Sequence, residues 1–143
     1  MKEYLPEIII TNHQLVNGMF SEADRLIKKK TELTLTQLLI LQSSKSDECE
    51  SQEEIAGILG VSQPAISKQI TQLIDKKLVT EIQKDRRSFT ISMTSKGKAE
   101  FKKAMDIYHS YNQKIFSSIN QQEIIEFVRV LQKLIKAYNS NLT

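Results

Sequence analysis

The apolar side chains of this chain recur at helical spacing over most of its length. In the segment 7–30 they fall three and four residues apart, which is the pattern of a helix with one apolar stripe. That stripe consists of Val16, Met19, Phe20, Ala23, Leu26 and Ile27. Similar stripes predict five further helices, which begin near residues 35, 52, 63, 95 and 121.

Polar residues at the expected helix starts support these boundaries. Thr34, Ser51 and Asn120 are each followed three residues later by Gln or Glu, which is the spacing of a capping box. Ser62 is a good N-cap for the next helix, and Gly60 can adopt the left-handed conformation that ends the helix before it. Two short helices are therefore expected to meet at a tight turn.

Between residues 78 and 93 the apolar period changes from helical to two. Phe89, Ile91 and Met93 alternate with polar residues, as in a half-buried strand. The expected partner strand is the segment 78–83, and the charged segment 84–87 would form the turn. The predicted fold is mainly α, with four helices, a β-hairpin that has a charged tip, and two more helices.

Length and composition fit a single globular domain. The chain has 143 residues, of which 40% are apolar and 26% charged, with only 4 Gly and 2 Pro. We expect a cytoplasmic protein, because no apolar stretch approaches a membrane span and the N-terminus lacks a secretory signal. The one cysteine, Cys49, cannot form an internal disulfide, which agrees with a reducing compartment.

The net charge of +3 is modest, but the basic residues are unevenly placed. The segment 62–98 has eight Lys and Arg against three Asp and Glu, whereas the segment 45–61 has five acidic residues against one lysine. A localised basic stretch is what contact with a phosphate backbone requires. A solvated surface that happens to be basic is the alternative interpretation.

The helices on either side of Gly60, followed by the hairpin, have the layout of a winged helix-turn-helix. In this motif the second helix enters the major groove of DNA and the first helix braces it. Ala56 stands where the two helices cross, and Val61 and Ile66 stand at the positions of core anchors. The second helix carries apolar residues on one face and short polar side chains, suited to base edges, on the other.

These motifs resemble the MarR family of bacterial transcription factors over nearly the whole chain. The matching segments are Leu33-Thr34-Leu35-Thr36-Gln37, the helix-turn-helix, the exit from Leu73 to Val79, Asp85-Arg86-Arg87, and Met93-Thr94-Ser95-Lys96-Gly97. The resemblance implies an obligate homodimer that reads a palindromic operator with two recognition helices and two wings. It assigns residues 1–32 and 99–143 to dimerisation and residues 33–98 to the DNA-binding lobe of a single domain.

The resemblance and the helix pattern together give the expected contacts with double-stranded DNA. They are Ser62, Gln63, Pro64, Ala65, Ser67, Lys68 and Thr71 on the recognition helix, and Lys84, Asp85, Arg86 and Arg87 in the wing. A narrow minor groove concentrates negative potential and so attracts a wing arginine. An ordinary solvated turn is the alternative for the wing. The sequence departs from the family before the first wing strand, where Lys77-Leu78 stand in place of the usual glycine, and at Glu81, near where a basic residue is common.

The resemblance also implies a signal, since family members commonly respond to small aromatic ligands, oxidants or metals. The candidate residues for a pocket that takes a small aromatic or apolar effector are Phe20, Tyr108 and Tyr111. Ordinary core packing is their alternative role. Cys49 lies among carboxylates that disfavour its thiolate, which argues against redox sensing. His13 and His109 are far apart in sequence, so we predict neither a metal site nor a cofactor.

The sequence therefore predicts a sequence-specific DNA-binding regulator, a repressor that a small-molecule effector releases. The alternative is a winged-helix module that binds protein and not DNA. Such a module would be expected to have an acidic or apolar recognition face, whereas this helix presents Gln63, Ser67, Lys68 and Thr71. No paired carboxylates, activated nucleophile or glycine-rich phosphate loop indicates an enzyme.

Overall fold

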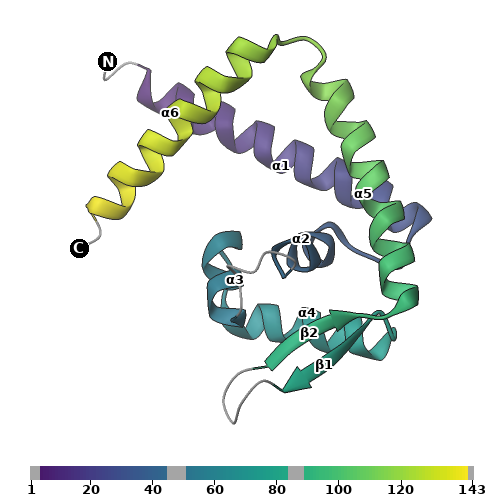
Figure 1. Ribbon diagram of the computed structural model, residues 1–143. Coiled ribbons are helices and arrows are strands. Elements are labelled where there is room, and N and C mark those ends of the chain that lie inside the picture. Colours follow the sequence, from purple (N-terminus) through teal and green to yellow (C-terminus); the bar gives the residue numbers. More distant parts are fainter. Residues whose placement is uncertain (1–3, 45–50, 84–88, 142–143) are drawn as a thin grey trace. The chain divides into compact units, whose positions relative to one another are not determined.

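The computed structural model describes residues 4–44, 51–83 and 89–141. This part of the chain forms six helices and one two-stranded hairpin, in the order that the sequence predicts (Figure 1). The elements are α1 (Leu5–Lys30), α2 (Leu35–Ser43), α3 (Gln52–Leu59), α4 (Gln63–Asp75), β1 (Val79–Gln83), β2 (Phe89–Met93), α5 (Ser95–Phe116) and α6 (Gln121–Ser140). The expectation of a mainly α fold with a small hairpin is confirmed. The chain divides into two compact units, residues 1–108 and 109–143.

The helix starts lie at the caps read from the sequence. Thr34, Ser51 and Asn120 each form a complete capping box, in which the cap side chain and the residue three positions later bond each other's backbone N–H. α1 begins at Leu5, two residues before the start that the apolar stripe predicts at residue 7, because Pro6 is tolerated in the first turn of a helix. α5 runs without interruption from Ser95 to Phe116.

Part of the core of the first unit forms where α2, α3 and α4 meet. One buried cluster joins the three helices and consists of Ile40, Ile55, Ala56, Ile66 and Ile70. Leu59, Ile74 and Ile91 pack against it and are partly buried. Burial of an isoleucine side chain contributes about 1.5–3 kcal/mol. This cluster is therefore a major restraint on where α4 lies, and Ile91 ties the hairpin to the same core.

The hairpin is antiparallel, with Val79 opposite Met93 and Gln83 opposite Phe89. β1 begins one residue later than expected, because the Leu78 N–H donates to the carbonyl of Leu73 in α4, at 2.9 Å. The charged segment 84–87, which the sequence predicts as the turn, lies outside the described residues, as does residue 88.

A left-handed residue ends α4. Lys77 has a φ of 58°, its N–H donates to the Ile74 carbonyl at 2.8 Å, and the next N–H, that of Leu78, bonds the Leu73 carbonyl. These two bonds make a Schellman motif, in which Leu73 and Leu78 are both fully buried. Glycine is usual at the left-handed position, because a Cβ there is strained. The departure from the family pattern at Lys77 therefore has a conformational cost.

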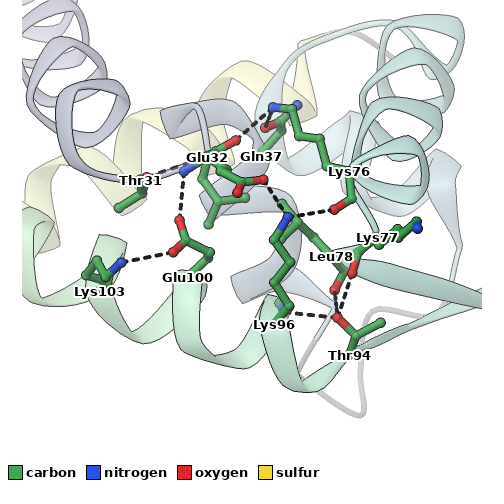
Figure 2. Close-up of polar contacts among 12 residues, drawn as sticks. Thr31, Glu32, Gln37, Lys76, Lys77, Leu78, Thr94, Lys96, Glu100 and Lys103 are labelled. Atoms are coloured by element: carbon green, nitrogen blue, oxygen red, sulfur yellow. Dashed lines mark hydrogen bonds and ion pairs between the residues drawn. The ribbon is translucent and has the colours of Figure 1, made fainter.

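The start of α5 packs directly on the backbone that follows α4. A Cβ added to Gly97 would lie 1.8 Å from the Leu78 carbonyl oxygen, so only glycine fits there. Thr94 caps α5, since its Oγ1 accepts the Gly97 N–H at 3.0 Å. The same hydroxyl lies 2.8 Å from the Lys77 carbonyl oxygen, to which it can donate. The helix cap and the end of α4 are thus held together (Figure 2).

Ion pairs and hydrogen bonds tie the corner between α1 and α2 to α5 (Figure 2). The Lys96 amine lies 2.8 Å from the Glu32 carboxylate and also donates to the Lys76 carbonyl at 3.1 Å. The Glu100 carboxylate accepts the Glu32 backbone N–H at 2.7 Å and the Lys103 amine at 3.0 Å. These bonds, above all the one from the Glu32 N–H, hold the pKa of the Glu100 carboxyl below its usual range.

Replacing Lys77 with glycine should stabilise the protein. Lys77→Gly relieves the left-handed strain, which costs about 1–2 kcal/mol for an L residue, while the more flexible unfolded chain offsets part of the gain. We expect Lys77→Gly to be about 1 kcal/mol more stable than Lys77→Ala, the control that removes the same charge but keeps a Cβ. Urea unfolding at equal protein concentration measures the difference, and an alanine variant as stable as the glycine variant would contradict it.

The contribution of Glu100 to stability should depend on pH. Since its pKa is lowered in the folded protein, the stabilisation is present above the unfolded-state pKa of about 4.3 and is lost as the pH falls through the lower folded value. Glu100→Gln should therefore be less stable than wild type at pH 7, and the gap should close toward pH 3. Asp106→Asn, which removes an exposed carboxylate from the same helix, is the control. A difference in stability between Glu100→Gln and wild type that stays constant with pH would contradict this assignment.

Candidate nucleic-acid interface

The turn between α3 and α4 sets the geometry of the candidate interface. Gly60 is left-handed, with a φ of 64°, as the sequence predicts for the end of α3. The chain then restarts at once, because the Ser62 Oγ accepts the N–H of Ala65 at 3.3 Å and so caps α4. Pro64 lies in the first turn, where an N–H would have no helical partner. The two helices meet at the tight turn that a helix-turn-helix requires.

α4 presents two distinct faces. Ile66, Ile70 and Leu73 are buried against the rest of the unit. The seven residues that the sequence predicts as contacts of this helix are all exposed, and they are Ser62, Gln63, Pro64, Ala65, Ser67, Lys68 and Thr71. The exposed face carries small polar groups and one cation, Lys68. Such groups can donate to and accept from the edges of bases or from phosphates.

The prediction that Val61 is a core anchor is wrong. Its side chain is 42% exposed, whereas Ile66, the other predicted anchor, is fully buried. The residue contributes through its backbone instead, because its N–H donates to the Ala56 carbonyl at 3.0 Å and closes the end of α3. The left-handed Gly60 changes the direction of the chain just before Val61, so helical spacing from α3 does not extend to it.

The predicted wing contacts, Lys84, Asp85, Arg86 and Arg87, lie outside the described residues. The described strands fix where this segment joins the hairpin, since β1 ends at Gln83 and β2 begins at Phe89. The hairpin follows α4 directly, and β1 packs against that helix. The two described strands therefore share their core with the helix-turn-helix.

The candidate effector residues lie on two helices and differ in exposure. Phe20, on α1, is 41% exposed, and Tyr108 and Tyr111, on α5, are half-buried. A hollow along the second unit is lined by α6 residues alone, and they are Gln132, Ile135, Lys136, Asn139 and Ser140. None of the three candidates lines this hollow, so their role as an effector pocket stays a prediction.

The described residues contain no metal-binding constellation, since no group of three or more His, Cys, Asp or Glu comes close enough to hold an ion. His13, one of the two histidines, lies on the exposed part of α1, with its Nε2 2.8 Å from the Asn17 amide nitrogen. Cys49 lies outside the described residues. None of the described helices is both long and apolar enough to span a membrane.

Gln37 is a contact that sequence reasoning missed. The sequence identifies it as the partner of Thr34 in a capping box, and that bond is present. The structure adds that the same side chain is fully buried and bonds Gln69 and Gln72 of α4 and Lys76, the C-cap of that helix. The spacing of Gln69, Gln72 and Lys76 by three and four residues is the one signal that could have indicated a polar stripe facing another element.

This chain is similar in sequence to known transcriptional regulators. A model of the MarR family matches residues 33–89. The HTH-type transcriptional regulator TcaR of Staphylococcus aureus (strain Newman) is 28% identical over 151 aligned positions, which cover 99% of each protein. The HTH-type transcriptional regulator BilQ of Clostridium symbiosum is 27% identical over 94 residues, which cover 64% of this chain. The chain spans 65% of the length of BilQ, slightly less than two thirds.

Solved structures share the fold over nearly the whole chain. The crystal structure of a MarR/EmrR family transcriptional regulator from Acinetobacter sp. ADP1 superimposes with a TM-score of 0.83, at 20% identity, and covers 96% of this chain and 98% of its own. The segment matched by the family model contains α2, the helix-turn-helix and β1. These elements carry the capped turn and the two-faced α4 described above. Over these elements the chain is similar to the MarR family, and it shares the fold of a MarR/EmrR family transcriptional regulator.

Proposed function

We propose that this protein binds double-stranded DNA with α4 in the major groove and regulates transcription as a homodimer. The observation that carries the proposal is the division of α4 into a buried apolar face and an exposed polar face with Lys68. A helix held rigidly from behind can present short polar side chains to base edges in a fixed register. α3 then braces α4 from the other side of the left-handed turn at Gly60.

A related fold supports this use of the helix. The transcriptional regulator MosR of Mycobacterium tuberculosis, solved in complex with DNA, superimposes on this chain with a TM-score of 0.69 at 20% identity, and the match covers 90% of this chain and 96% of that one. The similarity concerns the fold. The sequence adds the second contact, because Lys84, Arg86 and Arg87 give the hairpin a basic segment. We assign one wing arginine to the adjacent minor groove, with Asp85 orienting the tip.

A dimer is supported by the large apolar side chains that are exposed on α1 and on α6. Among the described residues no side chain of α6 is buried, although the helix carries a continuous apolar stripe. The exposed large apolar residues of α6 are Ile125, Phe127, Val128, Val130, Leu134, Ile135 and Tyr138, and those of α1 are Leu5, Ile8, Ile9, Ile10, Leu15, Val16 and Phe20. Contiguous surfaces of this kind mark protein interfaces. We infer that a second copy of the chain covers them.

Two copies would present two α4 helices, and a two-fold protein reads a palindromic operator. We further propose that the protein is a repressor released by a small aromatic or apolar effector. The support comes from the MarR family protein Rv2887 of Mycobacterium tuberculosis, whose structure contains p-aminosalicylic acid. That chain is 21% identical, with a TM-score of 0.68 and coverage of 91% of this chain and 97% of its own. Phe20, Tyr108 and Tyr111 are our candidates for the effector pocket.

Lysine and arginine substitutions test DNA binding. Lys68→Ala and Arg87→Ala should each weaken binding to the operator. Footprinting of the DNA upstream of the gene for this protein identifies that operator. Loss of one phosphate contact should also reduce the slope of log affinity against log salt by about 1. Lys102→Ala, an exposed lysine on α5, is the control and should bind as wild type does. Circular dichroism verifies that each variant folds.

Two results would contradict this interface. If both variants bind duplex DNA like wild type over a salt titration, the two surfaces do not contact DNA. If wild type itself binds no duplex in a gel-shift assay at low salt, the protein is a winged-helix module that binds other proteins.

A charge placed in the apolar stripe tests the dimer. Leu134→Glu should dissociate the dimer, because a carboxylate buried without a partner is strongly unfavourable, and it should weaken operator binding by removing the second half-site contact. Lys133→Gln changes the charge by the same amount on the polar side of α6 and is the control. Sedimentation equilibrium measures the mass of each variant. A dimeric Leu134→Glu variant, or a monomeric wild type, would overturn this assignment.

A further inference from the structure

The core of the first unit contains one polar side chain that packing alone does not explain. Among the described residues, Gln37 is the buried polar side chain, with no exposed surface. Its amide nitrogen donates to the Gln69 and Gln72 side-chain oxygens, both at 3.1 Å. Its amide oxygen accepts the Thr34 N–H at 3.2 Å and the Lys76 amine at 3.3 Å. A glutamine amide has two donors and two acceptor sites, so every one of them is used.

The three α4 partners lie along one line of that helix. Gln69, Gln72 and Lys76 are spaced by three and four residues, which places them on a common stripe. This stripe runs beside the apolar face and not along the exposed face of Ser67, Lys68 and Thr71, because each residue advances about 100° around the helix axis. Gln37 therefore bonds α4 along its flank.

Lys76 extends the same contact to the corner between α1 and α2. Its amine donates to the Glu32 carbonyl at 2.7 Å as well as bonding Gln37, as Figure 2 shows. The Lys76 carbonyl in turn accepts from Lys96 at the start of α5. The flank of α4 and its C-terminal end are thus bonded to two neighbouring elements.

Apolar and polar contacts restrain a helix in different ways. The buried isoleucines of α4 are attracted to the core without directional preference, so they hold the helix in place and tolerate small rotations about its axis. Hydrogen bonds weaken steeply when their geometry changes, so they fix that rotation. A buried polar network of this kind specifies one arrangement of a core when every member is satisfied. Gln37 meets that condition.

We propose that Gln37 is a positioning residue that fixes the rotation of α4 about its axis and thereby determines operator specificity. The proposal rests on the proposed function, since it concerns how α4 meets DNA. A rotation of about 15° moves a side-chain tip at a radius of about 6 Å by about 1.5 Å. That displacement exceeds the tolerance of a direct hydrogen bond to a base edge. Phosphate contacts through a flexible lysine are less sensitive, so nonspecific binding survives.

Three variants separate this role from a general contribution to stability. Gln37→Leu keeps the volume but removes all four bonds. Thr34→Ala removes the other half of the same capping box, at a cost of stability, and leaves the α4 bonds intact. Gln37→Glu keeps the cap and the Lys76 bond, and the amides of Gln69 and Gln72 can turn to donate to it. The last variant is the conservative rescue.

The measurement is the ratio of affinities for the operator and for a scrambled duplex of the same length, at one salt concentration. Gln37→Leu should lower this ratio about tenfold, as expected for one misplaced bidentate base contact, and should change scrambled-duplex binding less than twofold. Thr34→Ala and Gln37→Glu should keep the wild-type ratio. If Gln37→Leu keeps the ratio, or if Thr34→Ala lowers it equally, the positioning role is wrong.

A second measurement decides the rotation without DNA. Residual dipolar couplings of the α4 amides vary periodically along the helix, and the phase of that variation shifts when the helix turns about its axis. Gln37→Leu should shift the phase, and Thr34→Ala should not. An unchanged phase overturns the proposal. Failure of wild type to bind any duplex would instead overturn the proposed function, while the phase still reports on Gln37.

Discussion

Ile66 and Ile70 of α4 pack with Ile40 of α2 and Ile55 of α3 in one buried cluster, and this contact positions the helix-turn-helix within the first unit. The cluster holds α4 from behind, so its polar face remains exposed. The hairpin depends on the same core, because Ile91 packs against it. α4 and the strands of the hairpin therefore share one apolar contact, and a change in that contact would move them together.

Backbone geometry limits which residue types can occupy tight turns and the positions where two elements approach closely. Gly60 supplies the left-handed turn between α3 and α4, and Gly97 lets α5 lie directly on the Leu78 carbonyl. Lys77 takes the left-handed conformation without being glycine, because the two backbone bonds at the end of α4 and the burial of Leu78 hold it there. The fold thus tolerates local strain at a position where a buried side chain follows immediately.

Much of the fold could be predicted from short-range patterns. The capping boxes at Thr34, Ser51 and Asn120, the left-handed Gly60 and the alternation ending at Met93 each depend on residues a few positions apart, and each is present in the structure. The exposed face of α4 also follows from helical spacing. Val61 did not follow, because the direction of the chain after a left-handed residue decides its burial, and that direction is not encoded in the spacing of neighbouring side chains.

The sequence by itself determined the order of elements, the helix-turn-helix and the residues of the polar face, since these depend on local propensity and periodicity. Only the tertiary structure decided that Gln37 reaches α4 and that Glu32, Lys96 and Glu100 meet at one corner, because these contacts join residues more than thirty positions apart. Their partners are set by how the apolar faces pack. Local patterns can identify a side chain that caps its own helix, but not the second helix that it bonds.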